Sequence, residues 1–331
     1  MRREACLERY ALVSRLPSQA RGSRSRWHPL VRGLCYLLVL ALLPSIAGCS
    51  HSTAGSLQSA PPATEAIENK GSDTLVNLAL AWAERYMQIE PGVRISVTGG
   101  GSGTGIAALI NGTVDIANAS RQIKTEEGEA ARRNGVEPVE RIVALDAIAV
   151  IVNPHNPVER LSLQQISDIY TCKITNWREV GGEDRPIVLL SRESNSGTYV
   201  YFLEQVVRLG KDSDLLFAPD TLLMPSSEGI IEEVRQNPNA IGYDGLGYVT
   251  DDVKVIAVSR EADGPYVMPS VATVNDNSYP ISRPLYMYTD KSPSDRVLAY
   301  LDWILGDGQS IVNDLGFVPL GDYVARADSA N

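Results

Sequence analysis

The sequence predicts an α/β fold built on a largely parallel β-sheet, and three observations support this class. Segments with strand and helix patterns alternate from about residue 67 onward. A nearly continuous apolar run at 142–152 fits a strand buried on both faces. The 331 residues are 44% hydrophobic and 21% charged, a composition typical of a packed globular protein. At ~150 residues per domain, this length accommodates about two domains.

Local patterns place the individual elements. Val93, Ile95 and Val97 alternate with polar residues, which predicts a strand at 93–98, and shorter strands are expected at 115–119 and 187–190. The first helix has six apolar residues at helical spacing, and we expect all six in the core. They are Leu75, Leu78, Ala79, Trp82, Tyr86 and Ile89. Further helices are expected at 125–134, 163–170, 197–208, 227–236, 293–305 and 308–315.

The first 48 residues have the features of a targeting segment. They contain eight Arg and two Glu, and several Arg precede an apolar run at 33–47 that ends just before Cys49. This pattern resembles a bacterial lipoprotein signal, which implies cleavage before Cys49 and acylation of its side chain, palmitate included. An uncleaved membrane anchor is the alternative, but the run is shorter than the ~20 residues of a transmembrane helix.

The segment between this signal and the folded domain is a predicted tether. Residues 49–66 are rich in Ser, Ala and Pro, which favours a flexible linker. Cys172 is the one cysteine that follows the tether, so we expect no internal disulfide. The formal net charge is −10 although the signal is basic, so nucleic-acid binding is disfavoured.

Polar loops follow four of the expected strands and precede helices. Ser72 or Asp73 is a natural cap for the first helix, and the run 98–105 contains five glycines without the Lys of a P-loop. Ser120 and Arg121 follow the expected strand 115–119, whereas Arg192 and the run 196–198 follow the expected strand 187–190. Taken singly, such loops are ordinary caps, flexible turns or surface arginines. Together they would meet at the carboxyl edge of a parallel sheet, where open α/β folds bind ligands.

The order of these motifs resembles the phosphate-binding proteins that serve high-affinity ABC transporters, over nearly all of residues 67–321. Seven anchors carry the resemblance: Gly71-Ser72-Asp73-Thr74; Gly101-Ser102-Gly103-Thr104-Gly105; Asp115-Ile116-Ala117 with Ser120-Arg121; Leu161-Ser162 with Ile174-Thr175-Asn176-Trp177; Arg192 with Ser196-Gly197-Thr198; Ala240-Ile241-Gly242-Tyr243; and Gly316-Phe317-Val318-Pro319-Leu320. The resemblance implies a two-lobed, type II periplasmic-binding-protein fold. Each lobe would have a mainly parallel sheet flanked by helices, and two crossover strands would join the lobes. Lobe 1 would comprise 67–145 and 246–322, lobe 2 would comprise 146–245, and 323–331 would form a tail.

The resemblance, together with the polar loops, gives a set of candidate phosphate-binding residues. The set is Ser72, Asp73, Thr74, Ser102, Ser120, Arg121, Asp146, Arg192, Ser196, Gly197 and Thr198. Some relatives have an acidic residue where this chain has Arg121, and Cys172 stands where glycine is common. Asp146, alone in an apolar run, is the first candidate to accept the proton of phosphate, and Asp73 is the second. Alternatively, Asp146 pairs with Arg121 or Arg192.

These residues predict an extracytoplasmic receptor that captures inorganic phosphate between its lobes and hands it to ABC transporter permease subunits. We expect a monomer that is not an enzyme and needs no cofactor or metal. Only His51 and His155 follow the signal, and the chain contains no G-x-S-x-G or H-E-x-x-H motif. The alternatives are a receptor for tungstate, molybdate or sulfate, a phosphatase, or a phosphate-sensing surface lipoprotein.

Overall fold

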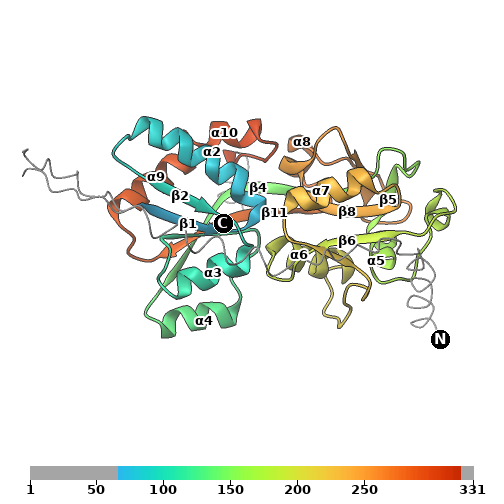
Figure 1. Ribbon diagram of the computed structural model, residues 1–331, viewed down its shortest axis with the longest axis horizontal. Coiled ribbons are helices and arrows are strands. Elements are labelled where there is room, and N and C mark those ends of the chain that lie inside the picture. Colours follow the sequence, from blue (N-terminus) through green and yellow to red (C-terminus); the bar gives the residue numbers. More distant parts are fainter. Residues whose placement is uncertain (1–65, 322–331) are drawn as a thin grey trace, which may run out of the picture. The chain divides into compact units, whose positions relative to one another are not determined.

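The computed structural model describes residues 66–321. The predicted signal, lipidation site and tail lie outside these residues, and so does the tether except for its last residue, 66. The described residues form two groups of elements, which we call the first and second lobes, with β4 (Pro138–Val152) and β11 (Ser282–Asp290) between them (Figure 1). The first lobe contains β1 (Ile67–Gly71), α2 (Asp73–Ile89), β2 (Ile95–Thr98), α3 (Ser102–Ile110), β3 (Ile116–Ala119), α4 (Thr125–Arg133), α9 (Asp295–Leu305) and α10 (Gln309–Asp314). The second contains β5 (Arg160–Ser162), α5 (Leu163–Tyr170), β6 (Val188–Arg192), α6 (Gly197–Phe202), β7 (Leu222–Met224), α7 (Ser227–Gln236), β8 (Ala240–Gly245), β9 (Lys254–Val255), β10 (Ala257–Ser259) and α8 (Val271–Asn275).

The principal sheet is parallel at both ends and antiparallel in the middle. Its strand order is β2-β1-β3-β11-β4-β8-β6-β7, with β9 also beside β4, and β10 pairs with β5 in a small second sheet. Strand β1 is parallel to β2 and β3, and β6 is parallel to β7 and β8. Strand β11 is antiparallel to β3 and β4, and β4 is antiparallel to β8. Each lobe therefore has a parallel sheet, as the sequence predicts. The sequence patterns did not, however, predict strand β11.

Strand β4 passes from one lobe into the other. Its first part, through Ala147, pairs with β11, whereas the part from Ile148 to Val152 pairs with β8. The segment 254–281, assigned to lobe 1 from the sequence, pairs with β4 and β5 and packs in the core of the second lobe. The sequence predicts that the chain returns to the first lobe near residue 246. In the structure the segment up to residue 281 still packs with the second lobe, so the chain returns later than predicted.

The core of the first lobe lies under the apolar face of α2. Five of the six core residues predicted on this helix are buried, and the indole N–H of Trp82 donates a hydrogen bond to the carbonyl oxygen of Gly308 at 2.7 Å. The prediction for Ile89 is wrong, because its side chain is 46% exposed. Ile89 is the last residue of α2, one turn beyond Tyr86, where the buried face ends.

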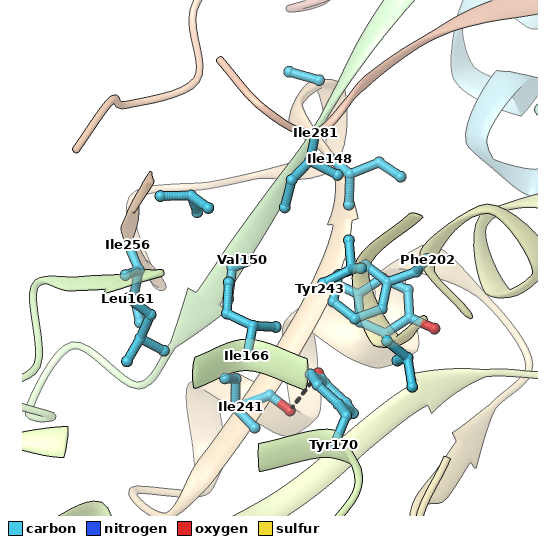
Figure 2. Close-up of a cluster of buried hydrophobic side chains, with 14 of the residues drawn as sticks. Ile148, Val150, Leu161, Ile166, Tyr170, Phe202, Ile241, Tyr243, Ile256 and Ile281 are labelled. Carbon is cyan, nitrogen blue, oxygen red and sulfur yellow. Dashed lines mark hydrogen bonds between the residues drawn. The ribbon is translucent and has the colours of Figure 1, made fainter. Parts of the chain in front are cut away.

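Aromatic side chains fill part of the core of the second lobe (Figure 2). The rings of Phe202 and Tyr243 stack with their centroids 3.5 Å apart. The hydroxyl of Tyr170 donates to the carbonyl oxygens of Leu190 and Ile241, at 3.0 and 3.4 Å. These bonds satisfy a buried hydroxyl and tie α5 to β6 and β8, the strands that lead toward α6 and the lobe interface.

The predicted helices are present, with two differences. Helix α6 ends at Phe202 and continues as a π-helical turn, Leu203–Val207, and the short α8 had no clear sequence signal. Within residues 66–321, none of the helices has the length and apolarity needed to cross a membrane.

Candidate functional site

Hydroxyl groups from four loops meet where α2, α3 and α6 begin. The Ser72 hydroxyl donates to Ser120 Oγ at 2.9 Å, and the oxygens of Ser102 and Ser120 are 3.3 Å apart. Across the lobes, the hydroxyls of Thr74 and Thr198 are hydrogen-bonded at 2.8 Å. All five side chains are buried. The polar loops that follow β1, β2, β3 and β6 therefore lie together, and three helix N-termini add partial positive charge there.

Gly197 allows the second lobe to approach these hydroxyls. A β-carbon at this position would lie 2.4 Å from Ser102 Oγ and 2.6 Å from Ser120 Oγ, closer than non-bonded atoms tolerate. The adjacent Ser196 caps α6, because its hydroxyl accepts from the backbone N–H of Thr198 at 3.2 Å. The glycine here is thus required by the close approach of two loops.

The glycine-rich loop also joins the two lobes. The backbone N–H of Gly103 donates to the carbonyl oxygen of Asn195 at 2.9 Å, and the Asn195 side-chain amide donates to the carbonyl oxygen of Gly100 at 2.9 Å. Gly101, with φ of 87°, would place a β-carbon 2.8 Å from that same Asn195 oxygen. The loop that brings Ser102 to the site is therefore shaped by contact with the second lobe.

Arg283 is the cation at the centre of the hydroxyl cluster, and sequence reasoning missed it. Its Nη2 donates to Thr198 Oγ1 at 2.8 Å and lies 3.5 Å from Thr74 Oγ1. Its Nη1 donates to the carbonyl oxygen of Ser120 at 2.9 Å, and the guanidinium lies over the ring of Tyr201. Apart from Asp290 at its end, β11 has no other charged residue than Arg283, a signal similar to the one that marked Asp146.

Asp146 is fully buried and bonds to Arg283. One carboxylate oxygen, Oδ2, accepts from Arg283 Nη2 at 2.9 Å, so the predicted pairing of Asp146 with Arg121 or Arg192 is wrong. The other oxygen, Oδ1, has no hydrogen-bond partner among residues 66–321. Burial raises the pKa of Asp146 to about 6, although the charge and hydrogen bond of Arg283 and the nearby Leu246 amide act in the opposite direction. An unpartnered acceptor thus lies beside the cation of the cluster.

The other two predicted arginines have different partners. The Arg121 guanidinium donates two hydrogen bonds to the Glu127 carboxylate, at 2.7 and 2.8 Å, so the structure does not bring it among the hydroxyls. Arg192 is buried and donates to Asp73 Oδ2 at 2.7 Å and to the hydroxyl of Ser227 at 2.9 Å. Both arginines are thus held by other side chains.

The start of α2 differs in one detail from the sequence-based expectation. Ser72 occupies the cap position but makes no side-chain cap, because its hydroxyl bonds to Ser120. Asp73 Oδ1 accepts from the backbone N–H of Gly100 at 2.8 Å, so this carboxylate braces the glycine-rich loop instead.

Residues 58–308 match the family model described as a PBP superfamily domain. The chain is 33% identical over 278 residues to the phosphate-binding protein PstS of Pseudomonas aeruginosa, covering 78% of this chain and 84% of that protein. It is 31% identical over 301 residues to PstS of Bacillus subtilis, covering 88% of this chain and 95% of that protein.

Solved structures agree with these relatives. A putative phosphate ABC transporter substrate-binding protein from Clostridium perfringens, solved with bound phosphate, superposes with a TM-score of 0.70 at 34% identity, over 77% of this chain and 99% of that chain. An ABC-type phosphate transport receptor from Vibrio cholerae superposes with a TM-score of 0.61 at 29% identity, over 76% and 99%. These matches confirm the two-lobed, type II fold expected from the sequence. The chain belongs to the PBP superfamily and, within it, to the family of the PstS phosphate-binding proteins.

Proposed function

We propose that this protein is the substrate-binding component of an ABC phosphate transporter and captures phosphate where α2, α3 and α6 begin. Relatives named for phosphate binding, and a similar structure solved with phosphate, support this function. The single observation that carries the placement is the position of Arg283 Nη2, which lies within 3.5 Å of Thr74, Thr198 and Asp146 oxygens. A buried guanidinium with convergent hydroxyls suits a tetrahedral oxyanion.

The proposed ligands come from both lobes. They are Ser72, Thr74, Ser102, Ser120, Ser196, Gly197, Thr198 and Arg283. Hydroxyls that now bond to one another can turn to donate to an anion, because a hydroxyl is both donor and acceptor. Arg121 is left out of this set because Glu127 holds its guanidinium.

Asp146 provides the proposed means of distinguishing phosphate from sulfate. Phosphate at neutral pH still carries a proton, whereas sulfate does not. Asp146 Oδ1 is a buried acceptor without a partner, so it can accept that proton in a hydrogen bond. Against sulfate the same oxygen would face a like charge, and sites that recognise a ligand hydroxyl reject analogues lacking it by on the order of 10⁴-fold.

The cellular setting is also part of the proposal. Lipidation of Cys49 would hold the protein at the membrane outside the cytoplasm, with residues 49–66 as the tether. The protein would act as a monomer and transfer phosphate to permease subunits without changing it chemically. A relative named as a phosphate-binding protein, and a similar structure described as a phosphate transport receptor, support a binding role over catalysis.

Isothermal titration of the mature protein, stripped of bound anion by unfolding and dialysis, tests this function. We expect one-to-one phosphate binding and no response to sulfate, molybdate or tungstate. Five heavy atoms at about −1.5 kcal/mol each give about −7.5 kcal/mol, which corresponds to micromolar affinity. Binding of another oxyanion alone would show that phosphate is not the anion that the protein carries. Hydrolysis of a model phosphate ester would overturn the assignment as a receptor.

A further inference from the structure

We infer that Arg192 and Asp73 form a latch between the two lobes and do not bind phosphate directly. The inference rests on the proposed function, because the latch acts by holding the lobes closed around phosphate. It assigns a positioning role to two residues that motif order alone would place among the ligands.

The guanidinium of Arg192 makes four hydrogen bonds to protein oxygens. Its five N–H groups can each donate one hydrogen bond. Two go to side chains, Asp73 Oδ2 at 2.7 Å and Ser227 Oγ at 2.9 Å, and two go to the carbonyl oxygens of Pro225 at 3.1 Å and Met224 at 3.4 Å. Nη1 also lies 3.5 Å from Asp244 Oδ2. Nε and both N–H groups of Nη2 are thus held by protein acceptors, so these groups could donate to phosphate only by giving up a partner.

Four of the five partners lie in the second lobe and fix the side chain there. Ser227 links the guanidinium to Asp244, because its hydroxyl accepts from Arg192 and donates to Asp244 Oδ1 at 3.0 Å. Arg192 is 1% exposed and Asp244 is fully buried. If the lobes separate, Arg192 therefore stays with the second lobe and loses only Asp73.

Asp73 connects the latch to the glycine-rich loop of the first lobe. Its Oδ2 accepts from Arg192, and its Oδ1 accepts from the backbone N–H of Gly100 at 2.8 Å. In addition, the hydroxyl of Tyr248 donates to the Asp73 carbonyl oxygen at 2.5 Å. Asp73 begins α2, where the helix dipole favours a carboxylate. One side chain thus holds both the opposite lobe and the loop that carries Ser102.

A latch of this kind changes affinity through the fraction of closed protein. Apparent affinity falls in proportion to the population of the binding-competent state. Removing one partner of a buried charge pair mainly changes the dissociation rate, whereas removing an exposed charge at the rim mainly changes the association rate. Arg192 is buried and the side chain of Asp73 is 16% exposed, so the effect should appear in the release rate.

The principal test is stopped-flow measurement of phosphate release and association for Asp73→Asn. The amide keeps an oxygen for the Gly100 N–H but removes the charge. We expect release to be roughly tenfold faster, which corresponds to loss of about one charge-assisted hydrogen bond, with association changed less than about threefold. Glu137→Gln is the matched control, because it removes a surface ion pair with Lys291 within one lobe and should change neither rate.

Arg192→Lys and the double variant Asp73→Asn/Arg192→Lys separate a latch from a ligand. If the pair is a latch, the double variant releases phosphate no faster than the faster single variant, because Asp73→Asn already removes the carboxylate with which the cation at position 192 interacts. Effects that multiply, or an unchanged release rate in Asp73→Asn, would overturn the inference. Thermal unfolding of each variant checks that the fold is retained.

A separate measurement tests the latch without depending on which anion the protein binds. Small-angle scattering without phosphate should give a larger radius of gyration for Asp73→Asn than for the unmodified protein. If the unmodified protein fails to bind phosphate, the proposed function is wrong while the radius still tests the latch. An unchanged radius would then count against it.

Discussion

Asp146 and Arg283 face each other as a cross-strand pair at the junction of the two lobes. They are directly paired in the antiparallel register of β4 and β11, and both are buried. Arg283 Nη2 and Nε approach the same carboxylate oxygen, Oδ2, at 2.9 and 3.3 Å. This arrangement neutralises the buried charge but leaves the Oδ1 acceptor available.

The first prediction concerns anion selectivity. Asp146→Asn should narrow the preference for phosphate over sulfate by at least about tenfold, because an amide can donate to sulfate where the carboxylate repels it. Competitive isothermal titrations at pH 7.5 measure the ratio of the two dissociation constants. A ratio equal to that of the unmodified protein would remove Asp146 from this role.

The second prediction compares two arginines. Arg283→Gln should weaken phosphate binding by about 100-fold or more, because it removes the central cation, whereas Arg121→Gln should change it less than about threefold. Loss of Arg283 also leaves Asp146 buried without a counter-ion, which costs about 3–5 kcal/mol of stability.

The double variant Arg283→Gln/Asp146→Asn separates these two effects. It should recover much of the lost stability in thermal unfolding but little of the phosphate affinity. Equal affinity losses in Arg121→Gln and Arg283→Gln would contradict the proposed assignment of the cationic ligand.

Sequence reasoning found most of the site because parallel strands place their following loops at one edge. Ser72, Ser102 and Ser120 follow β1, β2 and β3, which are neighbours in the sheet. Gly197 and Thr198 join them from the second lobe, as the shared motif order implied.

The remaining parts depend on contacts between distant segments. Arg283 reaches the site because β11 inserts between β3 and β4, and antiparallel pairing across 137 residues has no local signature. Arg121 follows the third strand as predicted, but Glu127 in the next helix holds its side chain. Ile89 keeps the helical spacing of the core residues, yet α2 extends beyond the surface that covers them.

The third prediction tests the close approach at Gly197. Gly197→Ala should weaken phosphate binding by at least about tenfold, because its β-carbon would force the loops apart by overlapping Ser102 and Ser120 oxygens. Gly92→Ala is the control, since a β-carbon there has open space around it. Titration calorimetry on both variants gives the comparison, and identical affinities would show that the loops can separate without loss of the site.

The fourth prediction concerns the backbone at Cys172. It follows the end of α5 with φ of 56°, a left-handed conformation that disfavours residues with a β-carbon. Cys172→Gly should therefore be more stable than Cys172→Ala by about 1 kcal/mol, since both variants lose the thiol and only glycine relieves the backbone. Urea unfolding gives this difference. Equal stabilities would mean that the left-handed turn carries no strain.

The fifth prediction is a pH dependence of sulfate binding. Because burial raises the pKa of Asp146 to about 6, its carboxyl is charged at pH 7.5 and largely neutral at pH 5. The neutral form donates a hydrogen bond, so sulfate affinity should rise as the pH falls through 6, and a bound anion shifts that midpoint upward. Asp146→Asn should lose this dependence. Titrations with sulfate at pH 5, 6 and 7.5 test the direction of this change. A sulfate affinity that decreases as the pH is lowered would contradict the role of this carboxyl.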